Sequence, residues 1–186
     1  HVWEEVGLST DWPRVTAVLN EVGLGPDLSM VAPAALAAAQ ARGSAVHEAI
    51  EGLVYGYLDE ATVPPVAAPY VSAFRKFLTE SGFEPTGAEL VVEHPSWRFR
   101  GHVDVIGWLS GRRALLDWKT SESVDLAAAG RQLAGYRLAY GAMHPEAPVD
   151  FVAVVQLMPD GRYRYHDIPH AEHEPVFLAA CVIWQA

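Results

Sequence analysis

Residues 101–119 constrain the fold of this chain more than any other segment. Apolar residues alternate on both sides of Ser110-Gly111, and this pattern predicts two short strands joined by a tight turn. Side chains of a strand point alternately to its two faces, so Asp117 and Lys119 share one face while Trp118 points to the other. The segment therefore predicts a β-hairpin whose second strand ends in a carboxylate and an ammonium on the same side.

Asp104 lies on the first of these strands and can meet Asp117 when the strands pair or lie near each other. Two carboxylates and the Lys119 ammonium then surround a volume the size of a hydrated divalent ion. Carboxylate oxygens bind hard cations, and a neighbouring lysine can orient a water molecule or bind a phosphate. The arrangement predicts metal-dependent phosphodiester cleavage. Asp-x-Lys by itself is also typical of a solvated strand edge.

Two further motifs flank the hairpin in sequence. A helix-favouring, Ala-rich stretch contains Gly43 and His47, and a neutral imidazole can bind a metal ion. Downstream, Gln132 and Tyr136 are four residues apart, so they share one face of an expected helix. In order, the chain carries Gly-x-x-x-His, Gly-x-x-Asp, Asp-x-Lys and Gln-x-x-x-Tyr.

These four motifs, in this order over about residues 42–140, resemble the PD-(D/E)xK nuclease superfamily. The chain is most similar to the RecB-type exonuclease branch, which includes the CRISPR adaptation exonucleases and the mitochondrial genome maintenance exonuclease. Residues 14–19 also resemble an N-terminal segment of some phage and mitochondrial members. Val103 stands where a proline often precedes the first Asp of the superfamily, and the RecB-type branch departs there too. The resemblance implies a restriction-endonuclease-like α/β core, in which helices flank a mixed β-sheet.

The resemblance also implies a role for each motif residue. Asp104 and Asp117 would bind Mg²⁺ or Mn²⁺ with His47 and with the backbone carbonyl of Trp118, while Lys119 would position the attacking water or the scissile phosphate. A nitrogen ligand among oxygens slightly favours Mn²⁺.

Four further residues are expected to line the site or contact DNA. They are Gln132, Tyr136, Arg131 and Arg100. An alternative for Gln132 and Tyr136 is that they simply pack against the sheet.

Several candidates keep simpler alternatives. A helical histidine such as His47 is often a partly buried, hydrogen-bonded residue rather than a ligand. Glu51, one turn later, can bind metal or water, or can be a solvated acid. Glu93 stands where family members often carry an acid. We expect it to have a structural role or to contact the metal ligands rather than the metal. Glu89 is expected to lie on the surface.

The composition restricts the class of protein. The chain has 186 residues, of which 51% are hydrophobic, enough for one compact domain over residues 1–186. No apolar run is long enough for a membrane span, and no N-terminal signal peptide is visible. Cys181 is the only cysteine, which excludes an internal disulfide and favours a reducing, cytoplasmic location.

The net charge of −10 argues against strong nucleic-acid binding, because phosphates are neutralised by Lys and Arg. We therefore expect modest, salt-sensitive affinity for DNA, with a protein partner that holds the substrate. The combined prediction is a Mg²⁺- or Mn²⁺-dependent DNA nuclease, an exonuclease acting on DNA ends or single strands. The alternatives are a non-cutting nucleic-acid-binding or assembly subunit of the same fold, and a hydrolase of small phosphoesters with a closed pocket.

The periodicity of apolar residues predicts the order helices, three strands, helix, two strands, helix. Helices are expected over residues 15–22, 34–58, 68–81, 126–140 and 173–184. Strands are expected over residues 89–93, 97–105, the second half of the hairpin, 150–158 and 162–168, with a turn at Asp160-Gly161.

Overall fold

The computed structural model describes residues 11–186 and contains one five-stranded sheet with the strand order β1-β2-β3-β4-β5. Residues 1–10, on which the prediction of no signal peptide rests, lie outside the described residues. The strands are β1 (Glu84–His94), β2 (Phe99–Leu109), β3 (Arg112–Lys119), β4 (Phe151–Leu157) and β5 (Tyr163–Ile168). Only β3 and β4 pair in parallel. The expected mixed α/β sheet is confirmed.

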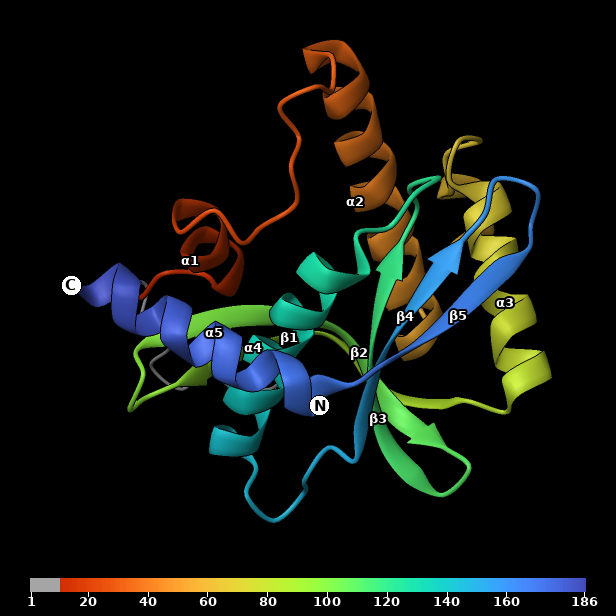
Figure 1. Ribbon diagram of the computed structural model, residues 1–186. Helices are drawn as coiled ribbons and strands as arrows, with labels where there is room; N and C mark the ends of the chain where they lie inside the picture. Colours follow the sequence, from red (N-terminus) through yellow and green to blue (C-terminus); the bar gives the residue numbers. More distant parts are fainter. Residues whose placement is uncertain (1–10) are drawn as a thin grey trace.

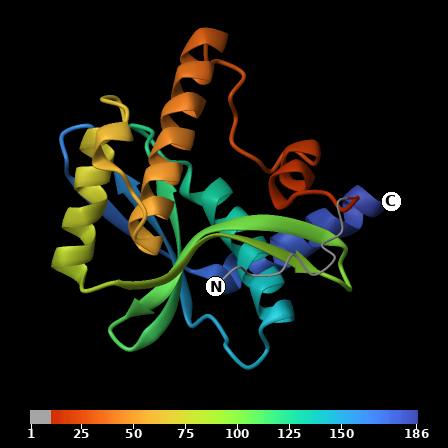
Figure 2. The same ribbon diagram turned by 180° about the vertical axis from the view of Figure 1, so that it is seen from behind.

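Helices cover both faces of the sheet (Figures 1 and 2). One face packs against α1 (Val15–Glu21), α4 (Leu126–Met143) and α5 (His170–Gln185), and the other packs against α2 (Pro33–Tyr55) and α3 (Ala68–Ser81). A 3₁₀ turn, η1 (Glu60–Thr62), joins α2 to α3. The predicted order of elements is confirmed.

Local sequence signals set most of the element boundaries. Ser110 and Gly111 both have positive φ values, 52° and 75°, as a two-residue hairpin turn of the favoured hand requires. Gly82 has a φ of 67° and ends α3 in the left-handed conformation. Several predicted bounds differ: α2 ends at Tyr55 rather than Leu58, β1 begins at Glu84 rather than Glu89, and β2 runs on to Leu109. The last two helices are also a few residues longer than expected. A second left-handed glycine, Gly56, stops α2 early.

Strand alternation places the polar motif on the α4 face. Leu115 belongs to the core under α4, whereas Leu116 and Trp118 belong to the core under α2 and α3. Asp117 and Lys119 follow Leu115 in the period-two pattern, so they project toward α4. The parallel β3–β4 pair needs a crossover connection, and α4 supplies it, which brings α4 beside the end of β3.

The strands β2 and β3 separate where the motifs lie. Their ladder runs from Leu109–Arg112 to Val105–Leu116 and stops there. Beyond that point β2 pairs only with β1, and the β1–β2 ribbon curves over α4 (Figure 2). This fork leaves backbone groups of β3 without a partner strand on one side. Among the described helices, none is long and apolar enough to cross a membrane.

Candidate active site

The fork between β2 and β3 is closed by a side chain instead of a backbone bond. Oδ2 of Asp104 accepts the N–H of Trp118 at 2.8 Å, replacing the missing β2 carbonyl. In an antiparallel pair the N–H and C=O of one residue face the same side, so the Trp118 carbonyl also faces Asp104. The indole of Trp118 points away and packs edge-on against Phe74 and Phe77.

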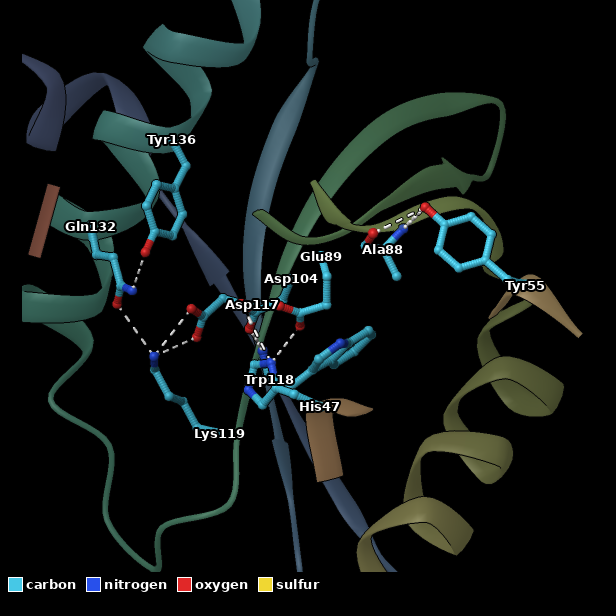
Figure 3. A network of polar contacts seen from close by, with 10 residues as sticks. All are labelled: His47, Tyr55, Ala88, Glu89, Asp104, Asp117, Trp118, Lys119, Gln132 and Tyr136. Atoms are coloured by element: carbon cyan, nitrogen blue, oxygen red, sulfur yellow. Dashed lines mark hydrogen bonds and ion pairs between the residues drawn. The ribbon is translucent and has the colours of Figure 1, made fainter. Parts of the chain in front are cut away.

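Lys119 is held between two acceptors on the α4 face. Its Nζ lies 3.1 Å from Oδ1 and 2.8 Å from Oδ2 of Asp117, and 3.3 Å from Oε1 of Gln132. Nε2 of Gln132 donates to the hydroxyl of Tyr136 at 2.8 Å. The helix spacing of Gln132 and Tyr136 therefore makes a chain of contacts that ends on the lysine, as Figure 3 shows.

On the other side of Asp104, α2 contributes His47. Its Nδ1 lies 2.8 Å from Oε1 of Glu89 and 3.8 Å from Oδ1 of Asp104. These three side chains offer ligand atoms that all lie within 4.8 Å of one another. Glu89 stands opposite Asp104 on β1, between the Ala88–Val105 and Leu90–Val103 pairs.

The acids and bases of the site shift one another's proton affinities. Burial lowers the pKa of His47, but the charges of Asp104, Glu89 and Asp117 outweigh it and raise the pKa to about 9. Burial, and then the charge of Asp117, raise the pKa of Asp104 to about 7. Burial lowers the pKa of Lys119, but the negative charges of Asp117 and Asp104 raise it by more. The net shift is upward, so the ammonium stays charged at neutral pH. Without a bound cation, ionisation of all the carboxylates in the site at once is therefore unfavourable.

The donor set fits a divalent metal ion. Asp117 is only 2% exposed, and its Oδ2 lacks an aligned hydrogen bond although it contacts the lysine ammonium. Carboxylates and one imidazole suit Mg²⁺ or Mn²⁺, whose ligands bind at about 2.1 Å and thus lie within about 4.2 Å of one another. A small contraction of the His47, Glu89 and Asp104 group reaches that distance. A bound cation would also relieve the repulsion that raises the pKa of Asp104.

A cleft of about 710 Å³ opens beside the site. Its walls are the α1–α2 connection, the N-terminal half of α2, the β3–α4 loop and the start of α4. His47, Lys119 and Gln132 are among its lining residues, whereas Glu89, Asp104 and Asp117 are not. That half of α2 projects beyond the sheet in Figure 1, and Leu28 and Val31 of the connection are exposed apolar lining residues.

The structure places two expected site residues elsewhere. Nε of Arg100 donates to the carbonyl of Trp12, and Nε of Arg131 donates to the carbonyl of Leu24. Both guanidinium groups thus bind the backbone on either side of α1, a structural role that the sequence did not predict. Their contact with DNA stays a prediction.

Two of the three predictions for flanking acids need correction. Glu89, expected on the surface, is half-buried against His47 and belongs to the possible metal group. Glu93 lies four residues after Glu89 on β1, where it pairs with Arg100, and its backbone N–H donates to Sδ of Met143. Four strand residues span about 13 Å, so Glu93 does not reach the metal group. The signal that favours Glu89 is its left-handed backbone, which sequence patterns do not reveal.

Glu51 also lies outside the metal group found among residues 11–186. Its carboxylate interacts with the hydroxyl of Tyr57, whose pKa is raised by burial and then by Glu51.

Comparison with known families identifies the superfamily of the chain. The model of the PD-(D/E)XK nuclease superfamily matches residues 53–178, which include Asp104, Asp117, Lys119, Gln132 and Tyr136. The chain belongs to the PD-(D/E)XK nuclease superfamily. Members of this superfamily act on nucleic acids with divalent metal ions, and the acids and lysine of this PD-(D/E)XK chain surround one site. His47 precedes the matched range, so the family match does not cover it, and its contact with Glu89 and Asp104 comes from the structure.

Two solved structures match the chain at low sequence identity. The structure titled LHK-Exo in complex with dAMP has a TM-score of 0.45 and 12% identity, covering 93% of this chain and 87% of that one. The structure titled SSO0001 has a TM-score of 0.37 and 14% identity, covering 80% of this chain and 72% of that one. No curated protein matches the chain.

Proposed function

We propose that this protein is a Mg²⁺- or Mn²⁺-dependent DNA nuclease of the RecB-type branch, an exonuclease that hydrolyses phosphodiester bonds at DNA ends or in single strands. The observation that carries the proposal is the position of Lys119, which is bonded to Asp117 and Gln132 and lines the cleft. A partly buried ammonium beside carboxylates can serve metal-dependent phosphodiester hydrolysis, because it stabilises negative charge that develops on the phosphate.

Each residue has a defined task in this proposal. Asp104, Asp117 and His47 would hold the metal ion, with the Trp118 carbonyl and Glu89 as further donors. Among the described residues, the ligand atoms of His47, Glu89 and Asp104 form one close group, and Asp117 lies outside it. The bound ion would supply Lewis acidity and lower the pKa of a water molecule. Lys119 orients that water or the phosphate and stabilises the negative charge of the transition state. Because its ammonium donates hydrogen bonds to both Asp117 and Gln132, Lys119 is already oriented before the substrate binds.

The size of the cleft favours a single strand. Its volume of about 710 Å³ lies within the range of about 300–1,000 Å³ typical of small-ligand sites. A short stretch of one strand fits such a space, whereas a duplex does not. Among the described residues of its lining, the basic ones are Arg42, His47 and Lys119. Affinity is therefore modest, and we propose that a protein partner adds to it.

We also propose that residues 1–186 form one nuclease domain, with its motif core at about 42–140. We further propose a cytoplasmic location, because the single, buried Cys181 suits a reducing environment.

The test is cleavage of end-labelled linear DNA, single- and double-stranded, with Mg²⁺, Mn²⁺ or EDTA. The wild type is compared with Asp117→Asn and with a matched control, Asp150→Asn, at the start of β4, opposite the site. We expect metal-dependent cutting that Asp117→Asn abolishes and Asp150→Asn retains, with single strands cut faster. A ladder that shortens from the ends would support exonuclease action. Equal cutting by Asp117→Asn would refute the assignment.

The second candidate is a non-cutting nucleic-acid-binding or assembly subunit, favoured by the net charge of −10 and the sparse basic lining. Mn²⁺ binding without any cleavage of either DNA form, alone or with a partner, would support this candidate.

A further inference from the structure

Helix α2 contacts the edge strand β1 at two neighbouring points (Figure 3). The first is the bond between His47 and Glu89. The second is the hydroxyl of Tyr55, which donates to the carbonyl of Ala88 at 3.0 Å and accepts the N–H of Ala88 at 3.1 Å. Tyr55 follows His47 by about two helical turns, so both side chains leave α2 on the same side.

Tyr55 takes the place of a neighbouring strand. β1 is at the edge of the sheet, and one hydroxyl satisfies both backbone groups of Ala88 on the side away from β2. Ala88 itself is buried. The position and orientation of its peptide groups are therefore fixed by a side chain from α2.

The residue after Ala88 has an unusual backbone. Glu89 has a φ of 51°, in the left-handed region that non-glycine residues seldom occupy. Such a conformation persists only where surrounding contacts determine it. Tyr55 holds the residue before Glu89, and His47 holds its carboxylate. The left-handed turn at Glu89 directs this carboxylate to the His47 and Asp104 pair.

We propose that Tyr55 is a positioning residue for the metal site: by holding Ala88 it keeps Glu89 in the left-handed conformation in which its carboxylate serves as a metal ligand beside Asp104 and His47. The inference rests on the proposed function, because it assigns a donor to the same site. Neither Tyr55 nor Glu89 belongs to the four motifs that mark this chain as a nuclease.

A purely structural role for Tyr55 makes a different prediction. If the hydroxyl only satisfies edge groups of the sheet, its loss lowers the melting temperature and leaves metal affinity unchanged. The two roles are therefore separated by measuring metal binding rather than stability.

The decisive variant is Tyr55→Phe, which removes the hydroxyl and keeps the ring. Because the residue is 43% exposed, the substitution leaves no buried cavity. We expect Mn²⁺ binding, measured by calorimetry, to weaken by about tenfold, the lower end for residues that orient metal ligands. Tyr57→Phe is the matched control, since its ring stacks on Tyr55 at 6.4 Å and it makes the same chemical change. It should bind Mn²⁺ as the wild type does.

A double-mutant cycle tests whether Tyr55 acts through Glu89. Glu89→Gln alone should weaken Mn²⁺ binding, and adding Tyr55→Phe to it should cause no further loss. Unchanged affinity in Tyr55→Phe, equal losses in both backgrounds, or a wild type that binds no Mn²⁺ would each overturn the inference. A wild type that binds Mn²⁺ in this way but does not cut DNA refutes the proposed function and leaves the inference standing.

Discussion

Gly101 lies directly against the ring of Tyr136: a Cβ atom at position 101 would stand 2.4 Å from Cε1 of the tyrosine. Gly101 opens the Gly-x-x-Asp motif, and Tyr136 ends the Gln-x-x-x-Tyr motif. The ring that passes over Gly101 carries the hydroxyl that holds Gln132, and Gln132 in turn holds Lys119. The glycine is therefore needed for close packing rather than for a special backbone angle.

Gly101→Ala should push the Tyr136 ring from its place. We expect the free energy of unfolding to fall by about 1–3 kcal/mol, as for overpacking in a core. Single-turnover cleavage should also slow, because Gln132 loses its anchor. Chemical denaturation and cleavage rates measure the two effects. An alanine variant with full stability and full rate would contradict the contact.

Gly43 has no such packing reason. It lies inside α2 and lines the cleft, and a Cβ there would meet no protein atom within 4 Å. Gly43→Ala should raise stability by about 0.5–1 kcal/mol, since alanine favours helices. If the substrate approaches this backbone, the KM for single-stranded DNA should rise.

Gly141→Ala is the matched control for Gly43→Ala, because Gly141 is also helical and open but lies outside the cleft. It should gain similar stability with no change in KM. An unchanged KM in Gly43→Ala would mean that DNA does not pass there.

Lys119→Met should separate metal binding from catalysis. Loss of the ammonium removes charge stabilisation in the transition state, so we expect cleavage to slow by about 10²–10³-fold. Mn²⁺ affinity should stay equal or become tighter, because a positive charge leaves the site. Calorimetry and single-turnover rates at saturating Mn²⁺ measure these effects. Lys76, the only other lysine, is exposed, and Lys76→Met should retain the wild-type rate.

Asp104→Asn should stabilise the metal-free protein. The folded-state pKa of Asp104 is raised to about 7, whereas an unfolded Asp titrates near 3.9. Folding therefore costs free energy wherever the unfolded Asp is ionised. The cost increases from pH 4 to pH 7, then stays constant.

We expect Asp104→Asn to gain on the order of 2–4 kcal/mol at pH 8 with EDTA. Below pH 4 the gain should vanish. Denaturation at several pH values measures this dependence. A gain in stability that does not depend on pH would show that ionisation of Asp104 does not destabilise the folded protein. In a separate measurement, Mn²⁺ should stabilise the wild type and not Asp104→Asn.

Metal affinity should rise with pH. His47 must lose its proton to bind a metal, and its pKa in the metal-free protein is about 9. Between pH 7 and 9 each metal displaces about one proton, so affinity increases by about tenfold per pH unit. Below pH 7 the slope is steeper, because Asp104 is protonated too. Calorimetry in buffers of different ionisation enthalpy counts the protons. His47→Gln should lose the slope above pH 7.

The sequence by itself determined the order of the elements and the central motifs. The hairpin at Ser110-Gly111 and the end of α3 at Gly82 follow from residues that favour positive φ, a local property. The shared face of Asp117 and Lys119 follows from the period of a strand, and the contact of Gln132 with Tyr136 follows from the period of a helix.

Only the tertiary structure decided which other residues join the site. Glu89 rather than Glu93 meets His47, because a register shift between Pro85 and Gly87 and a left-handed backbone at Glu89 redirect β1. Tyr55 reaches Ala88 only because α2 packs across that strand. These contacts join segments far apart in the chain, and their geometry depends on packing that no local pattern of residues encodes.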